Sequence, residues 1–186
     1  MVWEREHVRA FLNTAFSSFE WRNVGLIVNM AYEWGQRLGD MRTLTWDSYD
    51  LEKGVLTLTQ SKRGANITVP TSDGLKAMLA QQYEDFGWQP YIAPVPKPIK
   101  GKLMPYTVTR LSKAGIQIMA AAELPEELTL MDLRRTAITE MVDVGVPMSS
   151  IMSMSGHATP SSLTPYIKHT LRSATNAQSM RQFPTN

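Results

Sequence analysis

The 186-residue sequence contains no cysteine and only three histidines. The absence of cysteine excludes a disulfide scaffold, a thiolate metal site and a cysteine nucleophile. His7, His157 and His169 include no pair four residues apart, which excludes the helical zinc-hydrolase motif. These gaps leave hydroxyl nucleophiles and cationic side chains as the candidates for chemistry.

Long apolar runs and a large excess of one charge are also missing. No stretch approaches the roughly 18 consecutive apolar residues of a membrane span, so we expect no membrane partner. The first residues carry two acids and no apolar run, unlike a signal peptide, and we expect a cytoplasmic protein. The net charge is only +2. Residues 61–125 nevertheless hold eight basic and four acidic side chains, and we expect nucleic-acid contacts there.

Apolar residues follow helical spacing over much of the chain, and 43% of all residues are hydrophobic, enough for one packed core. Strand-like runs at 54–59 and 66–70, joined by a basic turn, predict a β-hairpin. Five prolines within residues 89–105 predict a long surface loop. The fold class is therefore predicted as α+β, predominantly α-helical with a small antiparallel β-sheet. The predicted helices cover 2–18, 21–32, 38–44, 73–83, 107–122, 130–144, 149–153, 160–168 and 171–180. The helix at 107–122 is expected to bury Leu111, Ala114, Ile116 and Ala120.

Four short segments carry charged or aromatic residues, and each alone has an ordinary interpretation. Arg37 can pair with Asp40 at the surface, and Lys62 can be a solvated turn residue. An arginine on an amphipathic helix usually extends along the helix or pairs with a carboxylate. A histidine after glycine often caps a helix, and a lone tyrosine often packs half-buried. The segments are Gly35-Gln36-Arg37-Leu38-Gly39-Asp40, the hairpin turn with Lys62, Asp132-Leu133-Arg134-Arg135-Thr136, and Ser155-Gly156-His157 followed by Tyr166.

In this order the four segments resemble the catalytic domain of the tyrosine recombinases, the phage integrase family. The first segment is similar to the family's first arginine box, with Asp40 at its acidic position. The turn at 60–64 is similar to the family's strand-turn segment with a lysine. The third segment matches the second arginine box, and the fourth matches the family's last histidine and its nucleophile. The resemblance spans about residues 8–172 and implies the DNA breaking-rejoining catalytic fold.

The resemblance implies site-specific DNA recombination, as in phage genome integration, through a 3′-phosphotyrosyl intermediate. In that reaction two arginines bind the phosphate oxygens bidentately, a histidine donates a further hydrogen bond and a lysine protonates the departing 5′-oxygen. No metal ion or other cofactor is expected, because side chains supply the cations. The implied catalytic residues are Arg37, Lys62, Arg134, His157 and the nucleophile Tyr166, with Asp40, His169 and the position of Met131 in support.

The second arginine box departs from the family at one position. The family has His-x-x-Arg, whereas this sequence reads Met131-Asp132-Leu133-Arg134. A thioether neither accepts a proton at neutral pH nor donates a hydrogen bond, so the expected proton acceptor for Tyr166 is missing. Water, His169 or another group can assist deprotonation of Tyr166 instead. Loss of the usual proton acceptor would therefore slow the chemistry without abolishing it. The alternatives are a weakened or inactive DNA-binding relative and a type IB topoisomerase.

The resemblance also implies binding partners and a cellular location. Double-stranded DNA is the expected partner, and family members act on it as homotetramers, whereas this domain alone is expected to be a monomer. Accessory DNA-bending proteins of phage or host, and a bacterial cytoplasm or nucleoid, follow from the same resemblance. Because Arg37 lies near the start of the chain, residues 1–186 are expected to be a single catalytic domain without the N-terminal DNA-binding domains.

Overall fold

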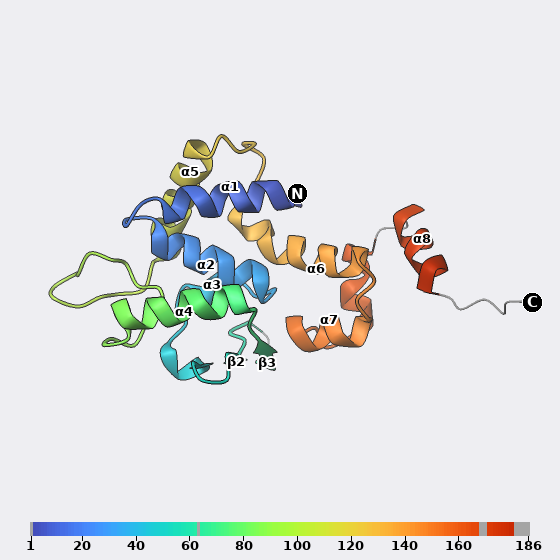
Figure 1. Ribbon diagram of the computed structural model, residues 1–186, viewed down its shortest axis with the longest axis horizontal. Helices are drawn as coiled ribbons and strands as arrows, with labels where there is room; N and C mark the ends of the chain where they lie inside the picture. Colours follow the sequence, from blue (N-terminus) through green and yellow to red (C-terminus); the bar gives the residue numbers. More distant parts are fainter. Residues whose placement is uncertain (1, 63, 168–170, 181–186) are drawn as a thin grey trace, which may run out of the picture.

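The structure, a computed structural model, describes residues 2–62, 64–167 and 171–180 (Figure 1). Helices dominate it, and the α+β class predicted from the sequence is confirmed. In the described part of the chain, no helix has the length and apolar character needed to cross a bilayer. The α-helices are α1 (Arg5–Phe16), α2 (Arg22–Glu33), α3 (Leu38–Met41), α4 (Asp73–Phe86), α5 (Val108–Ala121), α6 (Leu133–Asp143), α7 (Met148–Ser155) and α8 (Leu171–Met180), and the 3-10 helices are η1 (Trp46–Ser48), η2 (Leu130–Asp132) and η3 (Pro160–Tyr166).

One antiparallel sheet has the strand order β1 (Tyr49–Asp50), β2 (Val55–Thr59) and β3 (Asn66–Pro70). The predicted hairpin is β2 and β3, and its register pairs Leu56 with Val69 and Leu58 with Ile67. Because side chains alternate along a strand, this register puts these four residues on the same face, where Leu56, Ile67 and Val69 are buried in the core. β1 escaped sequence prediction, since two residues are too few to show alternation.

The main core lies in a body made of α1 to α5 and the sheet (Figure 1). α1 buries Val8, Phe11 and Ala15, which the helical repeat places on one face. α2 contacts α1, α3, α5 and α6 and is buried along most of its length. Each large apolar side chain removed from water contributes about 1.5–3 kcal/mol to stability. Because α2 buries most of its side chains and contacts four other helices, it is the centre around which the body packs.

A smaller core lies in what we term the arm, made of α6, α7 and η3. Its fully buried residues are Ile138, Ile151 and Leu163, one from each of the three helices. The surrounding side chains, including Met141, Met148 and Met152, are only partly buried. The arm touches the body through α6 against α2 and through α7 against β3.

The prolines at 89–105 do not make the whole segment a surface loop, and that prediction is wrong for its first half. Ile92, Ala93 and Val95 are at most 2% exposed and join the body core. The helix predicted at 130–144 also starts later, because its first turn is the 3-10 helix η2. Proline density reports the absence of a helix or strand and carries no information on depth.

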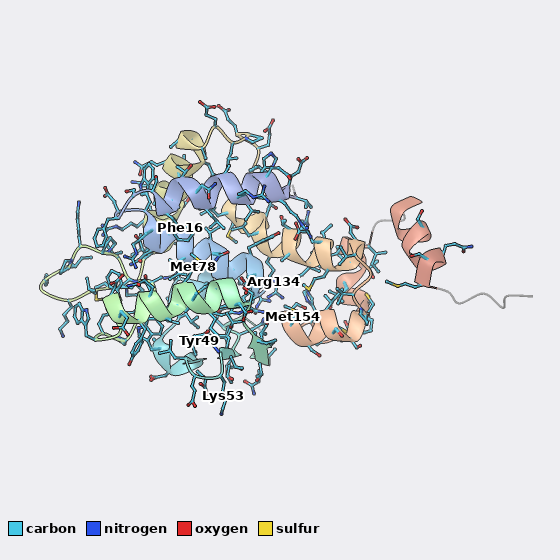
Figure 2. The ribbon with its side chains drawn as sticks, viewed as in Figure 1. Phe16, Tyr49, Lys53, Met78, Arg134 and Met154 are labelled. Carbon is cyan, nitrogen blue, oxygen red and sulfur yellow. The ribbon has the colours of Figure 1, made fainter. Side chains whose placement is uncertain are left out.

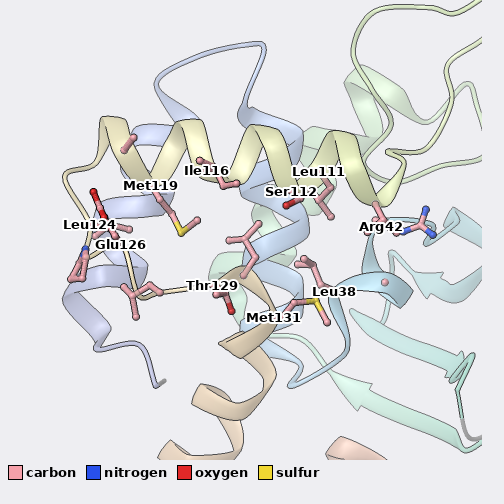
Figure 3. A pocket seen from close by; sticks show the side chains of 16 residues that line it. Leu38, Arg42, Leu111, Ser112, Ile116, Met119, Leu124, Glu126, Thr129 and Met131 are labelled. Atoms are coloured by element: carbon pink, nitrogen blue, oxygen red, sulfur yellow. The ribbon is translucent and has the colours of Figure 1, made fainter.

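The face predicted for α5 is only half right. Leu111 is buried and Ala114 partly buried, but Ile116 and Ala120 are exposed, and Ile118 is buried instead. Ile116 and Ala120 line an apolar groove of about 690 Å³ between α5, the following loop and the start of α3 (Figure 3). A groove-lining face repeats with the same helical period as a core face, so periodicity alone could not separate them.

Candidate active site

The carbonyl end of α7, formed by the backbone oxygens of Met154 and Ser155, is where the predicted site segments meet. The last carbonyls of a helix have no partner within the helix. The Met154 oxygen accepts a hydrogen bond from Gln36 Nε2 at 2.7 Å, and the Ser155 oxygen accepts one from Gln60 Nε2 at 2.9 Å. Arg134 Nη2 donates a second bond to the Ser155 oxygen at 2.8 Å. Figure 2 shows Arg134 and Met154 at the junction between body and arm.

Arg37 stands next to one of these contacts, since it directly follows Gln36 and precedes α3. Its Nη1 donates to Gln60 Oε1 at 3.3 Å and lies 4.0 Å from Asp40 Oδ2. The other oxygen of Asp40 accepts a hydrogen bond from the Ser61 backbone N–H at 3.2 Å. The Asp40 side chain is 4% exposed and that of Arg37 is 23% exposed. The carboxylate therefore connects α3 to the hairpin turn while the guanidinium keeps a face toward solvent.

Lys62 lies in the hairpin turn, and its side chain is exposed. The base of that turn is fixed by backbone bonds from Gln60 N to Ala65 O and from Gly64 N to Gln60 O, both 2.9 Å long. Lys62 comes two residues after Gln60 and directly after Ser61. The backbone therefore connects Lys62 to Gln60, a member of the hydrogen-bond network at the carbonyl end of α7. The Lys62 side chain is exposed and is not part of that network.

His157 is 8% exposed, and its Nδ1 lies 2.6 Å from Ser155 Oγ. The Ser155 hydroxyl donates its single proton to the Ile151 carbonyl oxygen, which is also 2.6 Å away and can only accept. The contact with the imidazole must therefore run from Nδ1–H to Ser155 Oγ. This fixes the tautomer of neutral His157, with its lone pair on Nε2.

Tyr166 lies against His157 at the end of η3. The two ring centroids are 5.9 Å apart and the planes meet at 73°, an edge-to-face contact. Tyr166 is half-buried, and Leu163 on the same 3-10 helix anchors η3 in the arm core. The tyrosine is thus held on the arm side of the site, next to the histidine.

Met131 is separated from this network. It lies on η2, is 79% exposed, and lines the groove of Figure 3 together with Leu38. Arg134 is three residues further along, on the first turn of α6. Position 131 is therefore grouped with the groove, and not with the hydrogen-bond network at the carbonyl end of α7. His169, the other predicted supporting residue, lies outside the described residues.

Further bonds between body and arm support the site from behind. Tyr32 on α2 donates its hydroxyl to Glu140 Oε2 on α6 at 2.7 Å. Burial, and then the neighbouring Glu140 carboxylate, raise the pKa of Tyr32 above its usual value near 10. The Trp3 backbone N–H donates to Thr136 Oγ1 at 2.9 Å. Polar contacts of this kind, together with Leu133 of α6, which is buried in the main core, hold α6 to the body.

Gln36, Gln60 and Ser155 are structural members of the site that sequence reasoning missed. They are at most 1% exposed, yet all three are polar. Buried polar residues produce no periodic pattern in a sequence. Gln36 and Gln60 also lie close to Arg37 and Lys62, the charged residues that were predicted to form the site. The available signal was the position itself, one residue before Arg37 and two before Lys62.

The sequence matches that of known proteins over most of its length. A profile described as the phage integrase family matches residues 3–172. Tyrosine recombinase XerA from Pyrococcus furiosus is 29% identical, in a match that covers 79% of this chain and 50% of that protein. The chain therefore spans about half the length of this curated relative.

Solved structures share the fold. A XerA recombinase superimposes with a TM-score of 0.77 at 14% identity, covering 98% of this chain and 65% of that one. A lambda integrase dimer bound to a COC′ core site superimposes with a TM-score of 0.71 at 19% identity, covering 100% of this chain and 50% of that one. The fold expected from the sequence resemblance is thereby confirmed.

Proposed function

Because the chain belongs to the phage integrase family, we propose that it cleaves and rejoins DNA strands as a site-specific tyrosine recombinase. The observation that carries the proposal is the gathering of two guanidiniums, an imidazole and a phenol around the carbonyl end of α7. Arg134 and Gln60 bind the same Ser155 oxygen, Gln60 binds Arg37, and Ser155 also holds His157. Residues more than a hundred positions apart in sequence thus meet within one hydrogen-bond network.

In the proposed reaction Tyr166 is the nucleophile. Its phenolic oxygen forms a bond to the phosphorus of a backbone phosphate, and the bond from phosphorus to the 5′-oxygen breaks. The product is a 3′-phosphotyrosyl link and a 5′-hydroxyl, and attack by a second 5′-hydroxyl reverses the step. Storing the bond energy covalently removes the need for a nucleotide cofactor. The phenolic proton leaves to water or to His169.

Arg37 and Arg134 would bind the phosphate oxygens as negative charge develops on them. Planar guanidiniums suit this role, because each can donate two parallel hydrogen bonds. His157 would add a bond from Nε2 when it is protonated, since its Nδ1–H is held by Ser155. Lys62 would protonate the departing 5′-oxygen from the hairpin turn. Asp40 supports both cations, since it contacts Arg37 and the Ser61 backbone.

Double-stranded DNA is the proposed partner, and a tetramer on DNA is the proposed assembly, with a monomer in its absence. The lambda integrase fold relative was solved as a dimer on DNA, which supports a DNA-bound multimer. We propose that residues 1–186 act as a catalytic domain, in a bacterial cytoplasm or nucleoid and with accessory DNA-bending proteins where the target requires them. Residues 61–125, which begin with the hairpin turn, hold eight basic and four acidic side chains, an excess of positive charge that fits a phosphate-facing surface.

The test is covalent capture of the chain on DNA. A pool of duplexes with randomised central sequence and a single nick lets the cleaved fragment diffuse away, so the protein–DNA link accumulates. We expect a species of increased mass on denaturing electrophoresis, absent with Tyr166→Phe, which has the same shape without the nucleophilic oxygen. DNA binding without any such species would refute the proposed enzyme activity.

A non-catalytic DNA-binding role is the competing function, and Met131 is the observation that favours it. Methionine cannot accept the Tyr166 proton, and Met131 is 79% exposed on η2. This role predicts retained, steeply salt-dependent DNA binding with no covalent species. A type IB topoisomerase would instead relax supercoiled plasmid as a monomer and give no recombinant product.

A further inference from the structure

We propose that Gln60 is a positioning residue that sets Arg37 and the lysine turn of the body against the histidine segment of the arm. The inference rests on the proposed recombinase function and adds a residue to it. Gln60 is the last residue before the hairpin turn and is 1% exposed. An uncharged side chain so deeply buried beside a charged site must satisfy all its polar atoms or destabilise the fold.

The Gln60 amide uses both kinds of polar atom to join three segments. Its Nε2 donates to Gln36 Oε1 at 2.6 Å and to the Ser155 backbone oxygen at 2.9 Å. Its Oε1 accepts from Arg37 Nη1 at 3.3 Å. Two donors and an acceptor on one planar group are found only in the amides of asparagine and glutamine. No carboxylate, hydroxyl or ammonium could replace this combination.

Gly156 completes the fit on the arm side. A Cβ at position 156 would lie 2.7 Å from Gln60 Oε1 and 2.9 Å from its Nε2, closer than any ordinary contact. Gly156 also has φ of +69°, a left-handed conformation that glycine adopts without strain. The glycine before His157 therefore ends α7 and makes room for the amide at the same time.

These contacts give Gln60 control over relative position. Arg37 sits on the body, whereas Ser155 and His157 sit on the arm, and the Gln60 side chain bonds to both sides. The Gln60 backbone closes the turn that carries Lys62. A shift of the amide would thus misplace a phosphate-binding cation, the general acid and the histidine together. Misplacement by about 1 Å is enough to slow chemistry by roughly 100-fold.

Gln82 provides a matched control within the same chain. It is 3% exposed and lies on α4 in the body. Its Nε2 donates to Asn23 Oδ1 at 3.0 Å and to the Ile92 oxygen at 2.8 Å, and its Oε1 accepts from Arg22 Nη2 at 2.9 Å. Gln82 thus has the same burial and the same kinds of partner as Gln60, but no link to the site.

The experiment compares Gln60→Met with Gln82→Met, because methionine keeps the length of the side chain and removes the amide. The readouts are the rate of covalent adduct formation at saturating protein, the affinity for the same nicked duplex, and the thermal midpoint. For Gln60→Met we expect the rate to fall about 10- to 100-fold while the affinity changes less than about threefold. For Gln82→Met we expect both to stay within about threefold of wild type, at a comparable loss of thermal midpoint.

Equal rates for Gln60→Met and wild type, or equal losses in the two variants, would overturn the positioning role. Should Gln60→Met fail to fold, Gly156→Ala displaces the amide instead, and Gly145→Ala is its control, since Gly145 is also left-handed with φ of +81° but lies far from Gln60. Slower cleavage by Gly156→Ala alone supports the role, and equal cleavage by both overturns it. If the wild-type protein forms no covalent adduct, the proposed recombinase function is refuted, and the positioning role of Gln60 is refuted with it.

Discussion

The body and the arm are built in different ways, although each contributes half of the proposed site. The body packs aromatic and branched side chains such as Trp3, Phe11 and Ile27 with almost no exposure. The arm has one small buried cluster with partly exposed methionines around it. Because methionine is flexible and fills irregular space, the arm core specifies its own packing less tightly.

The boundary between body and arm runs through the group of residues proposed to bind the phosphate. Arg37 belongs to the body, whereas Arg134, His157 and Tyr166 belong to the arm. Directional polar bonds, including those of Gln60 and Tyr32, join the two parts, together with Leu133 of α6, which is buried in the main core. A joint of this kind fixes geometry when all its bonds are made and opens at modest cost when one is lost. The arm is therefore the part expected to adjust when DNA is bound.

The largest effect is expected from removing either guanidinium. Arg37→Ala in the body and Arg134→Ala in the arm should each lower the cleavage rate by about 10²–10³-fold, since each removes donors from the developing phosphate charge. Adduct formation at saturating protein measures this. Arg135→Ala is the control, because adjacent helical residues point about 100° apart and Arg135 faces solvent. A loss confined to one arginine would show that the two parts do not share the phosphate.

A matched pair of core truncations should distinguish the two cores. Leu79 in the body and Leu163 in the arm are both fully buried. We expect Leu79→Ala to lower the free energy of unfolding by about 3–4 kcal/mol and Leu163→Ala by about 2 kcal/mol, because the arm methionines can relax into the space. Urea unfolding measures both values. A larger loss for Leu163→Ala would contradict a loosely packed arm.

A smaller change in rate should follow when the family's histidine is introduced at position 131, on η2. Met131→His supplies a proton acceptor beside the site, and we expect cleavage to accelerate by about tenfold, the lower part of the range for general-base assistance. Single-turnover adduct formation across pH 6–8 measures it, with Met131→Gln as a polar variant that cannot act as a base. An unchanged rate would mean that another group already takes the Tyr166 proton.

The smallest effect is expected at the joint behind the site. Tyr32→Phe removes the hydroxyl that Glu140 accepts from, at a cost of about 1 kcal/mol of unfolding free energy at neutral pH. The raised pKa of Tyr32 means that the unfolded chain loses its phenolic proton first. Stability from the neutral phenol is therefore complete below pH 10 and declines as the pH rises above it. Denaturant unfolding at pH 8 and pH 11 should show a shallower alkaline loss in Tyr32→Phe, and parallel curves would refute the assignment.

Sequence patterns predicted the features that repeat. The hairpin at 55–70 shows alternation, and α1 shows one apolar face, so both were predicted. Ile116 was misassigned, because a groove face and a core face have the same period. The arginine, histidine and tyrosine segments were identified by their resemblance to the phage integrase family, but their meeting point was not predicted, since the Ser155 oxygen is a backbone atom. The two glutamines that bind this end of α7 are long-range contacts with no local pattern.

Gly156 and Gln60 have a consequence for how this site can change over evolutionary time. A Cβ at 156 would collide with the amide at 60 and would stand on a left-handed backbone, so a residue larger than glycine at 156 is strained and also needs a shorter side chain at 60. A larger residue at 156 is best accommodated when a shorter one stands at 60. A chain that carries only the change at 156 would be a defective intermediate. Positions 60 and 156 should therefore covary among homologues, and the pair should change more slowly than its buried surroundings.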